Sequence, residues 1–359
     1  MFVAWRDLRF AKGRFALMGT VVVLMTLLVG LLSGLTAGLG KASTSAVTGL
    51  PADHLAFAAS SHGQPPSFTE STVDRAQQAG WARVPGVTAA EALGITTTKA
   101  TTSSGDTGVV SAFGVAPGSG LAPAAGRVGQ GEVVLSTGAA DALSTKAGQT
   151  VLLAGAPVRV TAVAGDASYS HTPVVWTSLA DWQRLTPGGG AGERATVIAL
   201  RTTGGADLAA ADTRLGTTTV TRDDARSAIG SYTSENGSLQ LMRGFLFAIS
   251  ALVIGAFFTV WTIQRAGDIA VLKALGATTG YLLRDALGQA VVLLVTGTAI
   301  GTGAAAGIGA AAAGTVPFVL DVSTMLLPAL VMIALGVLGA ALSVRRIASV
   351  DPLTALSTH

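Results

Sequence analysis

One short stretch of the chain combines charged and apolar residues in a way that suits docking to another protein. It reads QRAGDIAVLKALGATTGYLLRD over residues 264–285 and lies between two long apolar runs. On a helix its apolar residues share one face, and its first glycine after the stripe suits a helix C-terminal turn. The alternative is a helix that lies flat among lipid headgroups. The residues expected to dock are Arg265, Asp268, Ile269, Leu272, Lys273, Leu275 and Gly276.

No motif in the sequence suits catalysis or nucleotide binding. Lys41 follows glycines in GLTAGLGKAST, but a phosphate loop needs glycine where Leu35 stands and Ser or Thr where Ala42 stands. The histidines lack metal-ligand spacing, Asp223–Asp224 is typical of a solvated pair, and there is no cysteine. The basic residues form no clustered face of the kind that binds nucleic acid. We therefore expect no catalytic residue, no metal site, no cofactor bound by this chain and no nucleic-acid partner.

Glycines recur at four-residue spacing in two of the apolar runs. The first run has Gly30, Gly34 and Gly38, and a later run has Gly297 and Gly301. In lipid, small residues at this spacing let helix backbones approach closely. The first set fits two interpretations, packing within the chain and a dimer seam with a second copy.

Four apolar runs must position all of these residues. Half of the chain is hydrophobic and only 12% is charged, and each run reaches the roughly 20 residues that a membrane-spanning helix needs. The first run is also too long for a signal peptide, whose apolar core has about 7–15 residues. The predicted transmembrane helices are residues 15–39, 241–263, 286–313 and 325–344.

Basic residues outside the runs predict how the helices are oriented. Among the short segments that flank the runs, residues 1–14, 264–285 and 345–359 contain Lys and Arg, whereas the loop between the third and fourth runs has neither. The positive-inside rule places such basic segments in the cytoplasm. We therefore expect a multi-pass protein of the plasma membrane, in contact with lipids. Its cytoplasmic parts are an N-terminal interfacial helix (residues 1–14), a short helix within residues 264–285 and a C-terminal tail (residues 345–359).

Residues 40–240 are expected to fold outside the membrane as an α+β domain. Residues 131–143 suit a strand, a turn and a short helix, and residues 148–166 suit two strands joined at 155–157. Residues 174–185 suit a strand that runs into a helix, and residues 217–220 form a β-branched run. The predicted fold class is an α-helical membrane protein with four transmembrane helices and this extracytoplasmic α+β domain between helices 1 and 2.

The charged stretch resembles the coupling segment of FtsX/MacB-type (type VII) ABC transporter permeases, whose signature is R-x-x-E-I-x-x-L-(R/K)-A-L-G-A. Asp268 stands where that family has Glu, and the other signature positions match. RRIASVDPLTAL near the C-terminus is similar to the family's ending, and residues 131–166 resemble its periplasmic core domain. LLSGLTAGLG, SYTSENGSL and GAFFTVWTIQR are most similar to permeases of the DevC and haem-exporter group.

The resemblance implies mechanotransmission by a non-catalytic membrane subunit. Two permease chains, expected to be a homodimer, would bind two copies of a separate ABC ATPase that holds ATP and Mg²⁺. ATPase closure would push the coupling helices and move the outer domains, so that an amphipathic cargo is exported from the outer leaflet. The narrower similarity implies haem as that cargo.

Haem iron accepts His, Met or Tyr ligands, and we expect the cargo to meet Met25, Tyr232, Glu235 and Met242. Two other functions fit the resemblance. One is an FtsX-like transmembrane regulator that activates an extracellular cell-wall hydrolase, which predicts a pull-down with that enzyme. The other is export of a lipid, lipoprotein or peptide, which predicts ATPase activity stimulated by that cargo.

Overall fold

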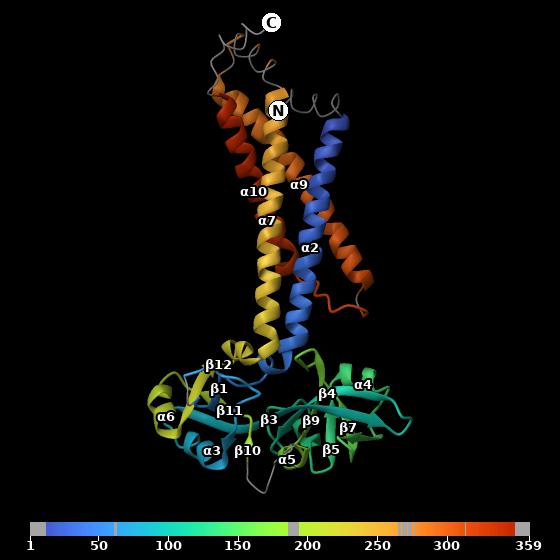
Figure 1. The fold of residues 1–359 in the computed structure, drawn as a ribbon, viewed down its shortest axis with the longest axis vertical. Helices are drawn as coiled ribbons and strands as arrows, with labels where there is room; N and C mark the ends of the chain where they lie inside the picture. Colours follow the sequence, from blue (N-terminus) through green and yellow to red (C-terminus); the bar gives the residue numbers. More distant parts are fainter. Residues whose placement is uncertain are drawn as a thin grey trace. The chain divides into compact units, whose positions relative to one another are not determined.

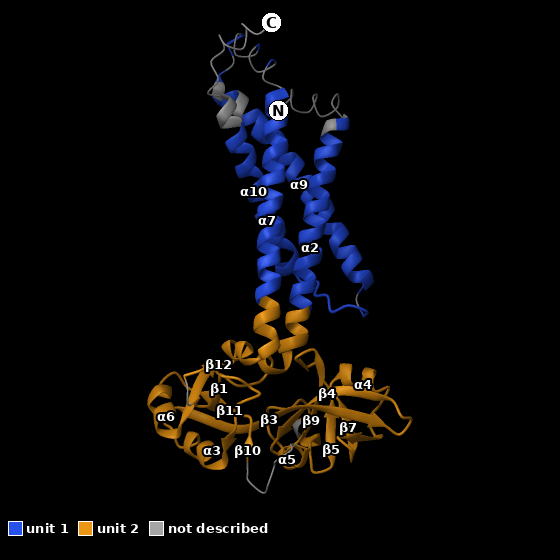
Figure 2. Ribbon diagram, in the orientation of Figure 1, with its two compact units in different colours: residues 1–38, 237–359 blue, residues 39–236 orange. Residues whose placement is uncertain are grey.

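A computed structural model describes residues 12–60, 63–185, 194–264, 267, 271, 275, 276, 278–312 and 314–348. The chain divides into two compact units, coloured separately in Figure 2. We call residues 1–38 and 237–359 the membrane unit and residues 39–236 the outer unit.

Among the described residues, four helices are long and apolar enough to cross a membrane, which confirms the predicted number of spans. They are α2 (Lys12–Thr48), α7 (Gly230–Gln264), α9 (Thr279–Ala312) and α10 (Val322–Ala348), labelled in Figure 1. All four are longer than the predicted apolar runs: α2 continues past residue 39, α7 begins before residue 241, α9 begins before residue 286, and α10 extends beyond both ends of its run. Hydropathy marks where lipid contact ends, whereas backbone hydrogen bonds decide where a helix ends. The Thr44 and Thr48 hydroxyls donate to the carbonyls four residues earlier, so these polar groups are satisfied within α2 itself.

Small residues bring the helices of the membrane unit close together. A side chain at Gly339 of α10 would meet the backbone of Gly255 in α7 at 3.3 Å. One turn further along each helix, the Thr259 and Ser343 hydroxyls are 2.8 Å apart. Such close backbone approach and interhelical hydrogen bonds are how helices associate in lipid. The largest buried side chains of this bundle include Ile254, Phe258, Trp261, Leu293, Leu294 and Met332.

The outer unit is built on a ten-stranded sheet with the order β12-β1-β11-β3-β4-β9-β5-β7-β6, to which β8 is added beside β9. Two further strands, β2 (Val73–Asp74) and β10 (Arg194–Ala195), form a small separate sheet. The strands of the main sheet are β1 (His54–Ala58), β3 (Val87–Thr102), β4 (Thr107–Val115), β5 (Glu132–Leu135), β6 (Thr150–Leu153), β7 (Ala156–Val163), β8 (Ser168–Tyr169), β9 (Thr172–Ser178), β11 (Val197–Thr202) and β12 (Thr217–Thr221). The helices are α3 (Arg75–Trp81), α4 (Thr137–Ala142), α5 (Leu179–Leu185) and α6 (Leu208–Leu215), with 3₁₀ turns η1 (Ala125–Arg127) and η2 (Asp224–Ala228).

The long strand β3 joins two lobes of the outer unit. Its first half pairs with β11, and its last residues pair with β6. On its other edge β3 pairs with β4, and the path through β9, β5, β7 and β6 returns to β3. This lobe therefore closes on itself and encloses a core of its own. The other lobe packs α3 and α6 against β1, β3 and β11.

The α+β class of the outer domain is confirmed, and four predicted segments have the predicted structure. Residues 131–143 contain β5 and α4, residues 148–166 contain β6 and β7, residues 174–185 contain β9 and α5, and residues 217–220 lie in β12. The turn between β6 and β7 is at Ala154–Gly155, one residue before the predicted site. Both turn residues have positive φ, +49° and +87°, which a two-residue hairpin turn requires.

Candidate functional site

The end of α2 and the start of α7 are embedded in one hydrophobic core of the outer unit. Val47, in the last turn of α2, and Leu50, just past α2, are 0% and 1% exposed, and Ile229, just before α7, is 2% exposed. They share this core with five aromatic rings whose neighbouring centroids are 4.9–5.8 Å apart in edge-to-face contacts. We call it the anchor core, and its rings are Phe57, Phe68, Phe113, Tyr169 and Trp176.

The two-residue turn Ser170–His171 between β8 and β9 contacts α2. Both residues have positive φ, +48° and +62°, which is the conformation of a type I′ hairpin turn. The Ser170 N–H donates to the Ser43 carbonyl at 2.9 Å, and the His171 N–H donates to the Ala42 carbonyl at 3.2 Å. The turn is therefore hydrogen-bonded to the outer end of α2, and we call it the hairpin clasp.

The same hairpin clasp also contacts the first turns of α7. The hydroxyls of Ser170 and Ser231 are 3.0 Å apart. His171 Nε2 lies 2.7 Å from Glu235 Oε2, and these side chains are 33% and 45% exposed. An exposed pair adds little stability, but it holds an imidazole and a carboxylate side by side at the surface. The clasp thus links α2 and α7 within the outer unit and presents two groups that can bind a ligand.

A second polar contact ties α2 to the outer unit. Lys41 Nζ lies 2.7 Å from Asp166 Oδ2, and the Ser168 N–H donates to Ser45 Oγ at 2.9 Å. The hydrogen bond from Lys41, followed by its positive charge, lowers the pKa of Asp166 below the ordinary value. Both side chains are more than half exposed, so solvent screens the pair.

We expect Asp166→Asn to remove a small and pH-dependent contribution to stability. Since the folded-state pKa of Asp166 is lowered, the stabilisation is present above the unfolded pKa of about 3.9 and is lost as pH falls through the folded pKa. The two proteins should differ by less than about 1 kcal/mol at pH 7 and converge in strong acid. Thermal unfolding at pH 7 and pH 3 measures this, with Lys41→Met as the matched variant. A difference of equal size at both pH values would contradict the assignment.

The four residues predicted to meet the cargo are divided between the two units. Tyr232 and Glu235 lie one turn apart near the start of α7 in the outer unit, with Tyr232 packed against the anchor core. Met25 packs into the buried cluster of the membrane unit, which is the ordinary use of a methionine in a core. Met242 is 56% exposed on α7. The structure therefore brings Tyr232 and Glu235 near the hairpin clasp, and it adds His171, which was not predicted.

The glycines at four-residue spacing in α2 contact other parts of the same chain. A Cβ at Gly30 would lie 2.9 Å from the Ala305 Cβ of α9, and a Cβ at Gly34 would overlap the Phe318 ring. A Cβ at Gly38 would overlap the Pro317 carbonyl. These contacts fit packing within the chain, the first of the two interpretations, and the dimer seam stays a prediction.

The end of the predicted docking segment is described by the structure. The Leu275 N–H donates to the Val271 carbonyl at 3.0 Å, which is a helical hydrogen bond, and Gly276 has φ +95° as a glycine after a helix often does. The Val271 and Leu275 side chains are 60% and 79% exposed. This turn therefore presents apolar surface. The other predicted docking residues, Arg265, Asp268, Ile269, Leu272 and Lys273, lie outside the described residues.

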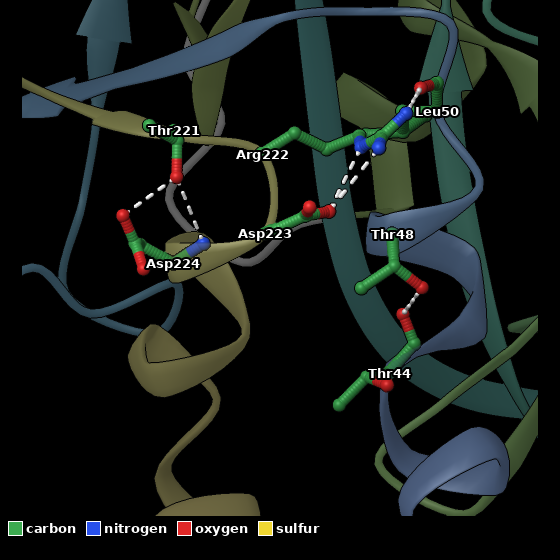
Figure 3. A network of polar contacts seen from close by, with 7 residues as sticks. All are labelled: Thr44, Thr48, Leu50, Thr221, Arg222, Asp223 and Asp224. Atoms are coloured by element: carbon green, nitrogen blue, oxygen red, sulfur yellow. Dashed lines mark hydrogen bonds and ion pairs between the residues drawn. The ribbon is translucent and has the colours of Figure 1, made fainter. Parts of the chain in front are cut away.

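The acidic pair Asp223–Asp224 is used in local structure (Figure 3). Arg222 contacts the Asp223 carboxylate at 3.2 Å and donates to the Leu50 carbonyl, just past α2, at 3.4 Å. Asp224 exchanges hydrogen bonds with Thr221 at 2.6 and 3.1 Å at the start of η2. Within the described ranges, no group of three or more His, Cys, Asp or Glu side chains is placed to hold a metal ion.

Comparisons with known proteins assign both units. Residues 17–218 match the MacB-like periplasmic core domain. Residues 241–352 match the FtsX-like permease C-terminal domain. Together they define a membrane permease whose extracytoplasmic domain lies between its first two spans. The chain belongs to the MacB/FtsX-like family of ABC transporter permeases.

Individual relatives include candidate hemin transport system permease proteins named HrtB. The protein from Staphylococcus haemolyticus is 26% identical over 99% of both chains. The protein from Staphylococcus epidermidis is 33% identical over 39% of this chain, and the match spans 40% of that relative's length. The crystal structure of the periplasmic region of MacB from Actinobacillus actinomycetemcomitans is 13% identical, with a TM-score of 0.35, over 50% of this chain and 94% of that one. The extracellular domain of the transporter YknZ from Gram-positive bacteria is 14% identical, with a TM-score of 0.34, over 47% of this chain and 98% of that one.

Proposed function

We propose that this permease is the membrane subunit of a haem exporter and is driven by a separate ABC ATPase. Two chains bind two ATPase subunits at the segment that ends in Leu275 and Gly276, on the cytoplasmic side, where both termini also lie. The exposed apolar turn at Val271 and Leu275 supports this, because buried apolar side chains supply much of the affinity of protein interfaces. The permease itself transmits motion and holds the cargo.

The anchor core explains how helix motion reaches the outer unit. Val47 in the last turn of α2, Leu50 just past α2 and Ile229 before α7 are buried in the same core. Protein interiors are close-packed, so a buried segment cannot slide without moving its neighbours. A displacement of either helix end therefore moves the outer domain as a body, without a flexible linker that would absorb the movement.

The observation that carries the haem proposal is the similarity along the full chain to a candidate hemin permease. The residues at the hairpin clasp agree with that cargo. Haem iron takes imidazole or phenolate ligands, and His171 and Tyr232 supply one of each near the start of α7. Glu235 already pairs with His171, so it can orient the imidazole.

We expect haemin to bind the purified chain through the hairpin clasp. A titration in detergent should give a saturable, shifted Soret band at about one haem per chain or per dimer. Glu235→Ala should weaken binding by about tenfold or more, since loss of a charged hydrogen-bonding partner costs roughly 1.5–3 kcal/mol. Glu70→Ala, which removes an exposed carboxylate elsewhere in the outer unit, is the matched control and should bind as the parent does.

Each outcome of that titration leads to a different conclusion. Binding that Glu235→Ala retains would keep haem as the cargo and remove Glu235 from its site. A folded chain without a specific band would overturn the haem proposal. In that case lipid-stimulated or peptide-stimulated ATPase activity would indicate another cargo, and co-purification of a secreted hydrolase would indicate a regulator.

A further inference from the structure

Helices α2 and α9 of the membrane unit pack side by side in parallel along a seam of small residues. The contacts advance by four residues on both helices, which is one helical turn per step. A Cβ at Gly297 would lie 2.9 Å from a Val22 methyl, and a Cβ at Gly301 would lie 2.8 Å from the Thr26 Cβ. The third pair in the series is Gly30 with Ala305, at 2.9 Å.

The next pair in this register consists of two glycines, Gly34 and Gly309, and here a phenyl ring occupies the seam. A Cβ on either glycine would overlap the ring of Phe318, so the ring lies between the two helices. For both glycines, the three atoms nearest to such a Cβ all belong to the Phe318 ring. The seam that is closed at Gly30 and Ala305 is therefore held apart one turn later by a phenyl ring.

Phe318 reaches this position from the loop that follows α9. The Val319 N–H donates to the Gly34 carbonyl at 3.1 Å, and the Pro317 carbonyl lies where a side chain at Gly38 would be. Phe318 itself is only half-buried. The contacts that hold the ring include one hydrogen bond of its neighbour and van der Waals contact with two glycines, and each of these is individually weak.

Without the ring, nothing in the register prevents the seam from closing. Gly34 and Gly309 continue the spacing of the closed pairs, and glycine pairs allow the closest approach of two helices. We propose that Phe318 is a removable wedge. With the ring inserted, the outer ends of α2 and α9 are apart, and with the ring withdrawn the two helices close along the whole seam. Because α2 is one helix from Lys12 to Thr48, the position of the ring determines the direction in which α2 runs beyond Gly34.

This inference concerns the membrane unit alone and does not depend on which cargo is exported. The chain has no cysteine, so pairs of introduced cysteines can carry spin labels without background. The outer pair is Leu35→Cys with Ile308→Cys, next to the wedge. The inner pair is Leu24→Cys with Ile300→Cys, at side chains that are 50% and 61% exposed beside the closed part of the seam.

Electron–electron distances in the full chain, reconstituted in lipid nanodiscs, test the wedge. Phe318→Ala should shorten the outer-pair distance by about 2–4 Å, since a ring adds about one carbon–carbon contact distance of 3.5–4.0 Å. The inner-pair distance should not change. Phe318→Leu, which keeps a branched side chain in the seam, should leave both distances close to those of the parent.

A rescue experiment separates a wedge from a general loss of packing. Phe318→Ala combined with Gly309→Leu returns bulk to the seam and should restore the outer-pair distance. The matched control combines Phe318→Ala with Gly307→Leu, because a side chain at Gly307 meets nothing within 4 Å. That control should stay short. An outer-pair distance that Phe318→Ala leaves unchanged, or that both leucines restore equally, would overturn the proposal. If Phe318→Ala does not fold, Phe318→Val carries the same expectation with a smaller shift.

Discussion

Replacing Leu275 by aspartate, alone or together with Leu272→Asp, is expected to release the ATPase from this permease. Leu275 is 79% exposed at the end of a helical turn, next to Val271 at 60%. A large apolar side chain that becomes buried on binding is worth roughly 2 kcal/mol or more when it is central to an interface, and aspartate adds a buried charge without a partner. We expect the amount of co-purified ATPase to fall by at least about tenfold.

The measurement is affinity purification of the tagged chain from its producing cells, with the co-purified ABC ATPase quantified by mass spectrometry. Leu152→Asp is the matched control, because Leu152 is a 40% exposed leucine on β6 of the outer unit. It should retain the ATPase at the level of the parent. Equal recovery from parent and Leu275→Asp would show that the docking surface lies elsewhere.

Phe113→Ala is expected to cause a large loss of stability in the outer unit. Phe113 is fully buried, and its ring meets Tyr169 and Trp176 edge-on at centroid distances of 5.6 and 5.2 Å. Removing a buried phenyl ring costs about 3–5 kcal/mol because the surroundings close the cavity only in part. The ends of α2 and the start of α7 share this anchor core, so the change also loosens the attachment of both helices.

Tryptophan fluorescence during thermal unfolding measures this effect. For a domain of this size, each kcal/mol shifts the midpoint by about 2–4 °C, so we expect a decrease of roughly 10 °C. Phe245→Ala removes the same ring from a position that is 67% exposed on α7. It should shift the midpoint of the outer unit very little. Equal shifts in the two variants would argue against the anchor core as the main source of stability in the outer unit.

The segments that were predicted correctly have local signals in the sequence. In residues 174–185 a run of β-branched and aromatic residues ends at Ser178, whose hydroxyl accepts the Asp181 N–H at the start of α5. The strand β3 was not predicted, because VTAAEALGITTTKATT has few large apolar residues and no alternation. Its structure depends on pairing with β4, β6 and β11, which are distant in sequence.

The candidate site was only half predictable for a similar reason. Glu235 could be named from its place at the edge of an apolar run. His171 could not, because its two-residue turn is formed by Ser and His instead of the Asn-Gly that marks type I′ turns. Only the folded chain brings it within 2.7 Å of Glu235. The docking segment stays a prediction: one continuous stretch of sequence carries both its charges and its apolar stripe, and the structure describes only part of it.

The anchor core also determines where chimaeric permeases can be joined. A graft designed from hydropathy would cut next to the predicted spans at residues 39 and 241. A graft designed from the strands would cut after Thr48 and before Gly230, and would leave Val47 and Tyr232 in the recipient while Phe113 and Trp176 travel with the donor. The unit that exchanges intact is residues 39–236, which carries the last turns of α2 and the first turns of α7 with it. Recombination between family members at residues 39 and 236 therefore transfers the whole anchor core. Recombination at the ends of the sheet would divide this core between the two parent proteins.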